Sequence, residues 1–161
     1  MQAMHNSPKV ALVTGAARGI GLASAQWFLQ QGHAVALLDI DVATLDGAVA
    51  ALAQPEHTLA LHADVRDSAQ VATAMAAVEA RFGRLDALVN NAGIAVFKPL
   101  LDTAFAEWRD VMATNLDGAF LCTQAAAPLM LKGGGGAVVN IASISGLRAS
   151  TLRVAYGTSK A

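Results

Sequence analysis

Short apolar runs alternate with helix-periodic stretches along the whole chain, and this alternation constrains the fold most strongly. The runs do not alternate apolar with polar residues, which is typical of strands that helices cover on both faces. Repeated strand–helix–strand units of this kind build a parallel sheet. We therefore predict five parallel strands, at residues 10–13, 34–38, 58–62, 87–90 and 137–141.

The segments between these strands carry apolar residues at helical spacing. Asp41 and Asp67 each precede such a stripe and are predicted N-caps, because an aspartate side chain accepts hydrogen bonds from the first helical turn. A longer helical stretch, from about residue 105 to 131, contains Asn115 and Gly118, and we expect a distortion there. The side chains expected to face inward from this stretch are Trp108, Val111, Met112, Phe120 and Met130.

The composition limits the classes of partner. Of the 161 residues, 55% are hydrophobic and 14% are charged, with a net charge of -1, which suits one compact domain. No cluster of Lys and Arg points to nucleic acid or an anionic membrane surface, and no apolar run approaches the roughly 20 residues of a membrane span. Small ligands are therefore the expected partners.

The cysteine and histidine content predicts neither a disulfide nor a metal site. The single cysteine, Cys122, excludes an internal disulfide and suits a reducing cytoplasm. Its apolar neighbours favour a core residue over a reactive thiol. We expect no metal, because no ligand spacing relates the four histidines, His5, His33, His57 and His62.

A glycine-rich loop directly follows the first predicted strand and opens a helix. Gly15, Gly19 and Gly21 have the spacing Gly-x-x-x-Gly-x-Gly. Glycines permit a tight turn and a close backbone approach, and the free N–H groups of a helix start favour a pyrophosphate. The loop, including Arg18 and Ile20, therefore predicts a nucleotide-binding site.

Asp39 ends the second predicted strand, where a carboxylate can accept hydrogen bonds from an adenosine ribose. A 2′-phosphate there would bring like charges together, so Asp39 favours NAD over NADP. Arg18 could reach a 2′-phosphate, which keeps NADP possible, and Asp39 could instead cap a helix. Ile40, which follows Asp39, adds no cation, so NAD stays the preferred cofactor.

Tyr156 and Lys160 stand four residues apart near the end of the sequence. In a helix, this spacing places both side chains on one face, about 6 Å apart along the axis, so that the ammonium can favour the phenolate. Such a pair can give and take protons. Taken alone, however, the spacing is more often that of an ordinary pair on a helix surface.

These features occur in one order and at consistent intervals. The series is the phosphate loop, Asp39, Asn90-Asn91-Ala92-Gly93, Asn115, Ser143 and Tyr156-x-x-x-Lys160. From Lys9 to the last residue, the chain resembles the classical branch of the short-chain dehydrogenase/reductase (SDR) family. The family's extended branch shares the Tyr-x-x-x-Lys element but has another glycine spacing and no such Asn-Asn-Ala-Gly motif. The resemblance implies one Rossmann-like α/β domain over residues 1–161, doubly wound, with strand order 3-2-1-4-5 and helices on both faces.

The resemblance also implies catalytic roles. Tyr156 would be the general acid/base at the substrate oxygen. Ser143, which matches the family's interval to the tyrosine better than Ser145, would hold the same oxygen. Lys160 would bind the nicotinamide ribose and lower the pKa of Tyr156, and Asn115 would organise a water that extends the proton relay.

Further matching residues would bind the cofactor. Asp64 and Val65 would meet the adenine ring, although Asp64 could instead form a turn. Ile141 would line the nicotinamide side, whereas Asn90 and Thr14 are expected to be structural. The complete set of expected cofactor contacts is Gly15, Arg18, Gly19, Ile20, Gly21, Asp39, Asp64, Val65, Asn91, Ala92, Gly93, Ile141, Tyr156 and Lys160.

The expected function is NAD(H)-dependent interconversion of a small or medium secondary alcohol and its ketone. One alternative is an NADPH-dependent 3-oxoacyl reductase, which Arg18 permits and Asp39 argues against. Another is a nucleotide-binding module without catalysis, which the complete set of Ser143, Tyr156 and Lys160 argues against. The resemblance also implies a homotetramer, with an interface partly through the long helix around Asn115 and the helix of Tyr156.

The resemblance implies further chain after Ala161: the rest of the tyrosine helix, two more strands and a segment that covers the substrate. Without them, the fifth strand would have an open apolar edge, and the helix of Tyr156 would be too short to hold together alone. We therefore expect the 161-residue polypeptide by itself to have little or no dehydrogenase activity. Residues 95–97 and 147–152 remain as candidates for the substrate wall.

Overall fold

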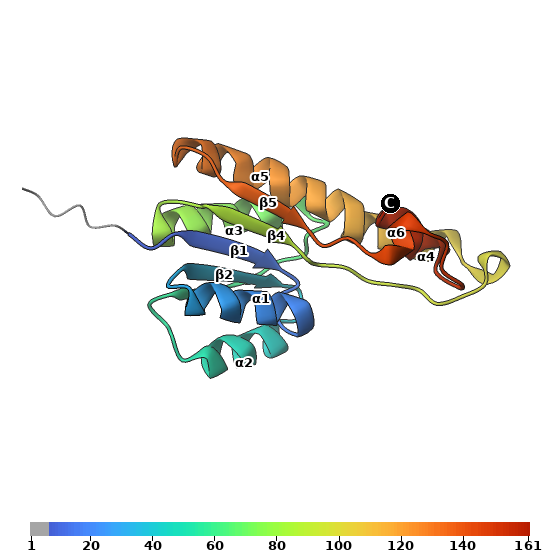
Figure 1. The fold of residues 1–161 in the computed structure, drawn as a ribbon, viewed down its shortest axis with the longest axis horizontal. Helices are drawn as coiled ribbons and strands as arrows, with labels where there is room; N and C mark the ends of the chain where they lie inside the picture. The colour runs from blue at the N-terminus through green and yellow to red at the C-terminus, as the bar shows by residue number, and fades with distance from the viewer. Residues whose placement is uncertain (1–6) are drawn as a thin grey trace, which may run out of the picture.

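The computed structural model describes residues 7–161 and contains a five-stranded parallel sheet between two layers of helices (Figure 1). The strands are β1 (Val10–Thr14), β2 (Ala34–Asp39), β3 (Thr58–His62), β4 (Ala87–Asn90) and β5 (Ala137–Asn140). The main helices are α1 (Gly19–Gln30), α2 (Val42–Leu52), α3 (Ser68–Phe82), α4 (Phe105–Met112) and α5 (Gly118–Lys132). Shorter elements are η1 (Leu100–Asp102), the π-helical η2 (Ala113–Asp117), α6 (Ile144–Leu147) and α7 (Val154–Ser159).

The strand order is β3-β2-β1-β4-β5, which confirms the prediction. β1 is central and fully buried, and its Leu12 lies opposite Ala36 of β2 and Leu88 of β4. Because the strands are parallel, their carboxyl ends meet at one edge of the sheet. The glycine-rich loop after β1, Asp39 at the end of β2 and the loop after β4 are therefore brought together.

Two apolar cores hold the helices to the sheet. Val71 and Val78 of α3 and Cys122 of α5 pack with Leu12 on one face. α1 and α2 cover the other face, where Leu45 of α2 packs with side chains of β1 and β2 (Figure 1). The strands are thus covered on both faces, which explains why their sequences are apolar without alternation.

Local signals in the sequence set several helix boundaries. Asp41 accepts a hydrogen bond from the N–H of Thr44, and Asp67 accepts from the N–H groups of Ala69 and Gln70, so both predicted N-caps are confirmed. Gly83 ends α3 in the left-handed conformation, with φ of 73°. The distortion predicted in the longest helical stretch is the π-helical segment between α4 and α5.

One inward-facing side chain was predicted wrongly. Val111 and Met130 are buried, but Phe120 is 62% exposed. The buried face of α5 contains Gly118 and Cys122. Phe120 is two residues from each of them, and two steps of about 100° turn its side chain to the opposite face of the helix. The wider π turn before α5 shifts the helical phase, so that Phe120 faces outward.

Cys122 is a core residue, as predicted. It is fully buried in α5, and desolvation raises the pKa of its thiol to about 12. The thiolate is therefore suppressed at neutral pH, which makes Cys122 a poor nucleophile. Among residues 7–161, no helix is long and apolar enough to cross a membrane.

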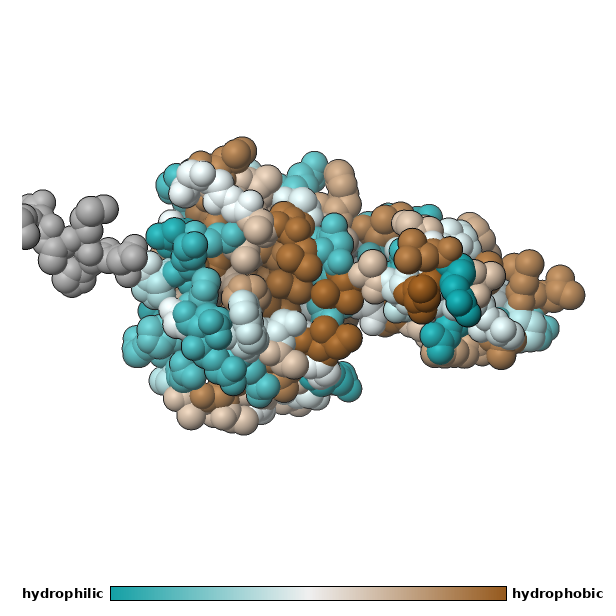
Figure 2. Space-filling model, in the orientation of Figure 1, coloured by the Kyte–Doolittle hydropathy of each residue, from teal (hydrophilic) through white to brown (hydrophobic). Residues whose placement is uncertain are grey.

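β5 forms one edge of the sheet, and all four of its residues are exposed. The exposed fractions of Val138 and Val139 are 41% and 50%. Hydrophobic surface also lies over the centre of the molecule in Figure 2. The apolar edge that we expected at the fifth strand is therefore present.

Candidate cofactor cleft and catalytic residues

The loop between β1 and α1 requires glycine at two close approaches. Gly15 has φ of 62°, and a Cβ atom there would lie 2.8 Å from Cα of Ala92. A Cβ atom at Gly21 would overlap the carbonyl oxygen of Gly15 and lie 2.6 Å from Nδ2 of Asn91. The backbones of two sheet-end loops and of α1 therefore meet without room for a side chain.

The start of α1 offers unpartnered donors. Arg18 occupies the N-cap position, but its side chain makes no capping hydrogen bond. Within the described residues, the N–H groups of Gly19, Ile20 and Gly21 have no acceptor, and the first bond of the helix runs from the N–H of Leu22 to the carbonyl oxygen of Arg18. This arrangement fits a pyrophosphate, because anions bind free N–H groups at the positive end of a helix.

Asp39 supports the phosphate loop as well as facing the cleft. Its Oδ2 accepts the N–H of Ala17 at 3.0 Å, and its Oδ1 accepts the N–H of Asp41 at 3.0 Å. The alternative was that Asp39 caps a helix, but the N-cap of α2 is Asp41. Arg18 pairs with Asp41 at 2.7 Å, so its charge is already partly neutralised.

A cleft of about 480 Å³ lies at the carboxyl ends of the strands. Nine of the fourteen expected cofactor residues line it: Gly15, Arg18, Ile20, Asp39, Asp64, Val65, Asn91, Ala92 and Gly93. The other five, Gly19, Gly21, Ile141, Tyr156 and Lys160, do not line this cleft. Ile141 and Lys160 line a separate cavity of about 450 Å³, between β5, α5 and α7.

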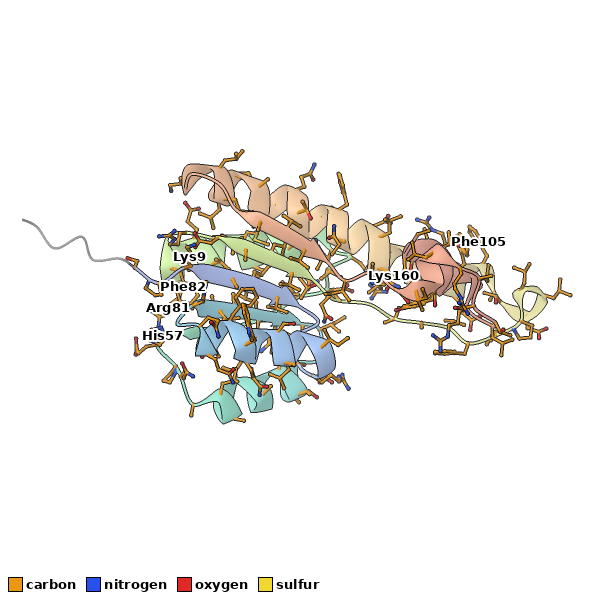
Figure 3. All side chains as sticks on the ribbon, viewed as in Figure 1. Lys9, His57, Arg81, Phe82, Phe105 and Lys160 are labelled. Carbon is orange, nitrogen blue, oxygen red and sulfur yellow. The ribbon has the colours of Figure 1, made fainter. Side chains whose placement is uncertain are left out.

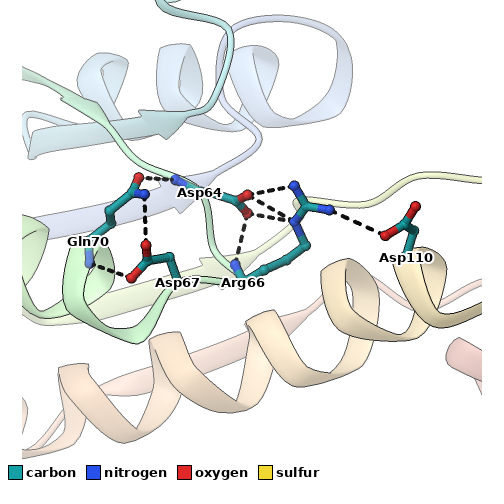
Figure 4. Close-up of polar contacts among 5 residues, drawn as sticks. All are labelled: Asp64, Arg66, Asp67, Gln70 and Asp110. Carbon is teal, nitrogen blue, oxygen red and sulfur yellow. Dashed lines mark hydrogen bonds and ion pairs between the residues drawn. The ribbon is translucent and has the colours of Figure 1, made fainter. Parts of the chain in front are cut away.

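Asp64 is fixed by an adjacent arginine (Figure 4). Its carboxylate accepts from Nε and Nη2 of Arg66 at 2.9 and 2.7 Å, and these hydrogen bonds lower the pKa of Asp64. Arg66 also reaches Asp110 of α4 at 3.6 Å. The N–H of Arg66 bonds Oδ1 of Asp64 at 2.9 Å, so Asp64 forms a turn and also lines the cleft.

Asn91 clamps the phosphate loop, a role that sequence reasoning missed. Its Nδ2 donates to the carbonyl oxygens of Thr14 and Gly15 at 2.9 and 3.0 Å. Thr14 returns the contact, because its Oγ1 accepts the N–H groups of Asn91 and Ala92 at 3.0 Å. The structural role expected for Thr14 is therefore present. The available signal was the position of both residues at the ends of neighbouring strands.

Tyr156 and Lys160 lie together at the carboxyl end of the sheet. Nζ of Lys160 is 6.0 Å from the centroid of the Tyr156 ring and donates to the carbonyl oxygen of Ile141 at 2.7 Å. Burial lowers the pKa of Lys160. Figure 3 shows Lys160 where the sheet meets α6, opposite the end that carries Lys9 and His57.

Ser143 follows β5 and caps α6. Its Oγ accepts the N–H of Ser145 at 3.2 Å, which leaves the Ser143 hydroxyl proton available to another acceptor. The rival Ser145 is buried, and its Oγ is 2.8 Å from Oγ of Ser150. The geometry therefore favours Ser143 over Ser145 as the free hydroxyl.

Asn115 joins three segments from inside the π-helical turn. Its Oδ1 accepts the N–H of Ile94 at 2.8 Å, and its Nδ2 donates to the carbonyl oxygen of Ile94 at 3.0 Å and to Oγ of Ser159 at 2.9 Å. Oγ of Ser159 donates to the carbonyl oxygen of Tyr156 at 2.9 Å. Ser159 was missed, although a small polar residue beside Lys160 was a signal for a buried contact.

Asn90 ties neighbouring elements together, as expected. Its Nδ2 donates to Oδ1 of Asn140 in β5 at 2.8 Å and to Oγ1 of Thr123 in α5 at 3.0 Å. The contact fixes the end of β5, from which the chain continues to Ser143. Within residues 7–161, no group of three His, Cys, Asp or Glu side chains could hold a metal ion.

Comparison with known proteins agrees with this geometry. The family model described as short chain dehydrogenase matches residues 9–161. This chain belongs to the short-chain dehydrogenase/reductase family. The SDR fold, with its strand order and two helical layers, is the one predicted from the sequence.

Several SDR proteins are similar over nearly all of this chain. D-threitol dehydrogenase of Mycolicibacterium smegmatis (strain ATCC 700084 / mc(2)155) is 44% identical over 156 residues, which cover 94% of this chain and 59% of that protein. NAD-dependent glycerol dehydrogenase of Listeria innocua serovar 6a (strain ATCC BAA-680 / CLIP 11262) is 40% identical over 153 residues, which cover 95% of this chain and 59% of that protein. The solved structure of NAD+-bound xylitol dehydrogenase has a TM-score of 0.91 at 35% identity. The match covers 96% of this chain and 61% of the chain in that structure. The chain thus spans about 60% of the length of these relatives.

Proposed function

We propose that this SDR chain belongs to an NAD(H)-dependent oxidoreductase that interconverts a secondary alcohol and a ketone. The observation that carries the proposal is the Lys160 ammonium beside the Tyr156 ring, at the same end of the sheet as the cleft that Asp39 lines. A group that takes up the alcohol proton and a dinucleotide cleft at one end of a sheet are what alcohol oxidation by hydride transfer requires. Two similar proteins, named for NAD, support this choice.

Tyr156 gives and takes the proton at the substrate oxygen in this proposal. NAD(H), when bound, supplies the hydride chemistry. Ser143 donates its free hydroxyl proton to the same oxygen, because its own lone pair already holds the N–H of Ser145. Lys160 uses one N–H on Ile141 and keeps two for the nicotinamide ribose.

Asn115 contributes to proton transfer mainly by holding the helix of Tyr156 in place. Both N–H bonds of its amide are used, on Ile94 and on Ser159. Its side chain therefore retains only acceptor capacity at Oδ1 for a water in the relay. The link through Ser159 to the carbonyl oxygen of Tyr156 keeps the tyrosine helix against the π-helical turn.

Cofactor choice is tested with Asp39→Asn in the full-length protein. We expect the unmutated protein to prefer NAD and the variant to reduce that preference on the order of 10-fold, because the charge that repels a 2′-phosphate is removed. The single side-chain oxygen of asparagine can still accept the N–H of Ala17, whereas the N–H of Asp41 loses its acceptor, so the phosphate loop keeps the hydrogen bond made to the loop itself. The measurement is kcat/KM with each cofactor over a panel of secondary alcohols.

Asp46→Asn, which removes an exposed carboxylate of α2 outside the cleft, is the matched control and should leave the preference unchanged. Equal or better use of NADPH by the unmutated protein would favour a 3-oxoacyl reductase instead. Binding of NAD without turnover of any alcohol or ketone would favour a nucleotide-binding module.

We further propose that residues 1–161 act as one dinucleotide-binding unit within a homo-oligomer. Exposed apolar side chains gather along α4, the π-helical turn and α5: Phe105 at 77%, Leu116 at 49% and Phe120 at 62%. Such surfaces commonly become buried between subunits. The outward rotation of Phe120 supports the interface that the family resemblance implies.

A further inference from the structure

A second cleft of about 480 Å³ lies between the loop after β4 and the helices α6 and α7. Three basic residues, Lys98, Arg148 and Arg153, line it with no Asp or Glu side chain, and Ala161, the last residue of the sequence, also lines it. The whole chain carries 11 basic and 12 acidic residues, so this excess of positive charge is local. We call these three residues and the cleft between them the cationic groove.

Arg153 is held in position without being neutralised. The centre of its guanidinium lies 4.6 Å from the centroid of the Phe97 ring, and the side chain is half-buried. Among the described residues, neither Arg153 nor Arg148 forms an ion pair with a carboxylate, whereas Lys98 pairs with Glu107. Stacking on an aromatic ring fixes the guanidinium plane and leaves its N–H edge available to an anion.

The backbone around Arg153 is strained and tied down. Leu152 has φ of 59°, a left-handed conformation that costs a leucine about 1 kcal/mol or more. Its carbonyl oxygen accepts the N–H of Lys98 at 3.0 Å, which joins the two walls of the groove. Ser145 and Ser150 add a hydroxyl contact of 2.8 Å across the same loop. The groove is therefore preorganised and is not a chance gathering of free side chains.

The groove is distinct from the cofactor cleft and borders α7, and Ser143, Tyr156 and Lys160 do not line it. None of its lining residues lines that cleft. Gly157 and Thr158 line the groove and directly follow Tyr156 on α7. Residues 147–150 and Leu152, which we expected in the substrate wall, also line it. Figure 2 shows strongly hydrophilic residues beside hydrophobic ones on the part of the molecule formed by α4 and α6.

We propose that the cationic groove binds an anionic group, a carboxylate or a phosphate, carried by the alcohol substrate. The proposal rests on the proposed function and narrows its substrate class to hydroxy acids or phosphorylated alcohols. Arg153 is the principal ligand, because guanidinium presents paired N–H donors that match both anions. Arg148 adds a second unpaired charge, and Lys98 a third that Glu107 partly neutralises.

The test is titration calorimetry of the full-length protein, in the presence of NADH and at low salt, with two matched pairs of ligands. The carboxylate pair is 3-hydroxybutyrate and the neutral 1,3-butanediol, and the phosphate pair is glycerol 3-phosphate and glycerol. We expect the charged member of at least one pair to bind about 10-fold or more tightly than the neutral one. The pair with the larger difference identifies the anion.

Substitutions then identify which basic residue binds the anionic group. Arg153→Gln should raise the Kd of the charged ligand by about 10- to 100-fold without changing that of the neutral one, and Arg153→Lys should recover part of the loss. Arg148→Gln, at an exposed position, should give a smaller change in the same direction and does not depend on the fold around Phe97. Arg109→Gln removes an equal charge from α4 outside the groove and serves as the control.

Equal binding of the charged and neutral members in both pairs would overturn the proposal, as would an equal effect of Arg153→Gln and Arg109→Gln. Turnover of the same ligands, measured with NAD in place of NADH, separates this proposal from the function on which it rests. If neutral alcohols are oxidised and Arg153→Gln does not change the preference, the groove assignment is wrong and the oxidoreductase assignment stands. If binding depends on Arg153 but no ligand is oxidised, the groove stands and the reaction is wrong.

Discussion

Tyr156→Phe is expected to lower kcat for alcohol oxidation by about 10²- to 10⁴-fold, because the variant loses only the hydroxyl that carries the proton. The ring that faces Lys160 remains, and Tyr156 does not line the cleft at the phosphate loop. The Kd for NAD(H) should therefore change little. Steady-state kinetics and titration calorimetry on the full-length protein measure the two quantities separately.

The unchanged Kd is the internal control for this variant, because a misfolded α7 or a displaced Lys160 would weaken binding of the nicotinamide ribose as well. Ser143→Ala is a second test of the proposed proton transfer. It removes the hydroxyl donor and the cap of α6, and we expect kcat to fall as it does for Tyr156→Phe. A kcat for Tyr156→Phe close to that of the unmutated protein would exclude Tyr156 as the acid/base.

Gly21→Ala should cause the largest loss of cofactor binding among single changes in the phosphate loop. The added Cβ would overlap the carbonyl oxygen of Gly15 and lie 2.6 Å from Nδ2 of Asn91, closer than real Cβ contacts. The backbone of the loop must then move, at a cost of about 1–3 kcal/mol in the free energy of unfolding. We expect a rise in the Kd of NAD of about 10-fold or more, measured by calorimetry.

Gly47→Ala provides the matched control. Gly47 lies inside α2, has no heavy atom within 4 Å of an added Cβ and does not have a positive φ. Alanine there should stabilise the protein by up to about 1 kcal/mol, since it is the better helix former, and should leave the Kd of NAD unchanged. Similar behaviour of the two alanine variants would show that the close packing at Gly21 does not govern the loop.

The sequence predicted the sheet well because strand composition and helix stripes are local properties. Each predicted strand overlaps the observed one, with ends that differ by at most one residue, as for Asn140 at the end of β5. Glycine spacing and the acid at Asp39 also predicted that the glycine-rich loop and Asp39 would line one cleft, because a parallel sheet brings the carboxyl ends of its strands to one edge.

Apart from the structural role of Asn90, the sequence did not reveal contacts between distant segments. Asn91 holds Thr14 from 77 positions away, and Asn115 holds Ser159 from 44 positions away, so no local pattern contains either pair. The exposure of Phe120 depends on the wider π-helical turn before α5, which rotates the following side chains about the helix axis. The positive charge of the cationic groove likewise gathers only when the loop after β4 meets α6 and α7.

The hydride itself gives the most direct test of the proposed reaction. Secondary alcohols that carry deuterium on the carbinol carbon are incubated with NAD and the full-length protein, and the reduced cofactor is analysed by mass spectrometry. We predict that the deuterium appears in the nicotinamide ring and that Tyr156→Phe suppresses the transfer. Bound NAD that acquires no deuterium from any neutral, carboxylated or phosphorylated alcohol would contradict the assignment.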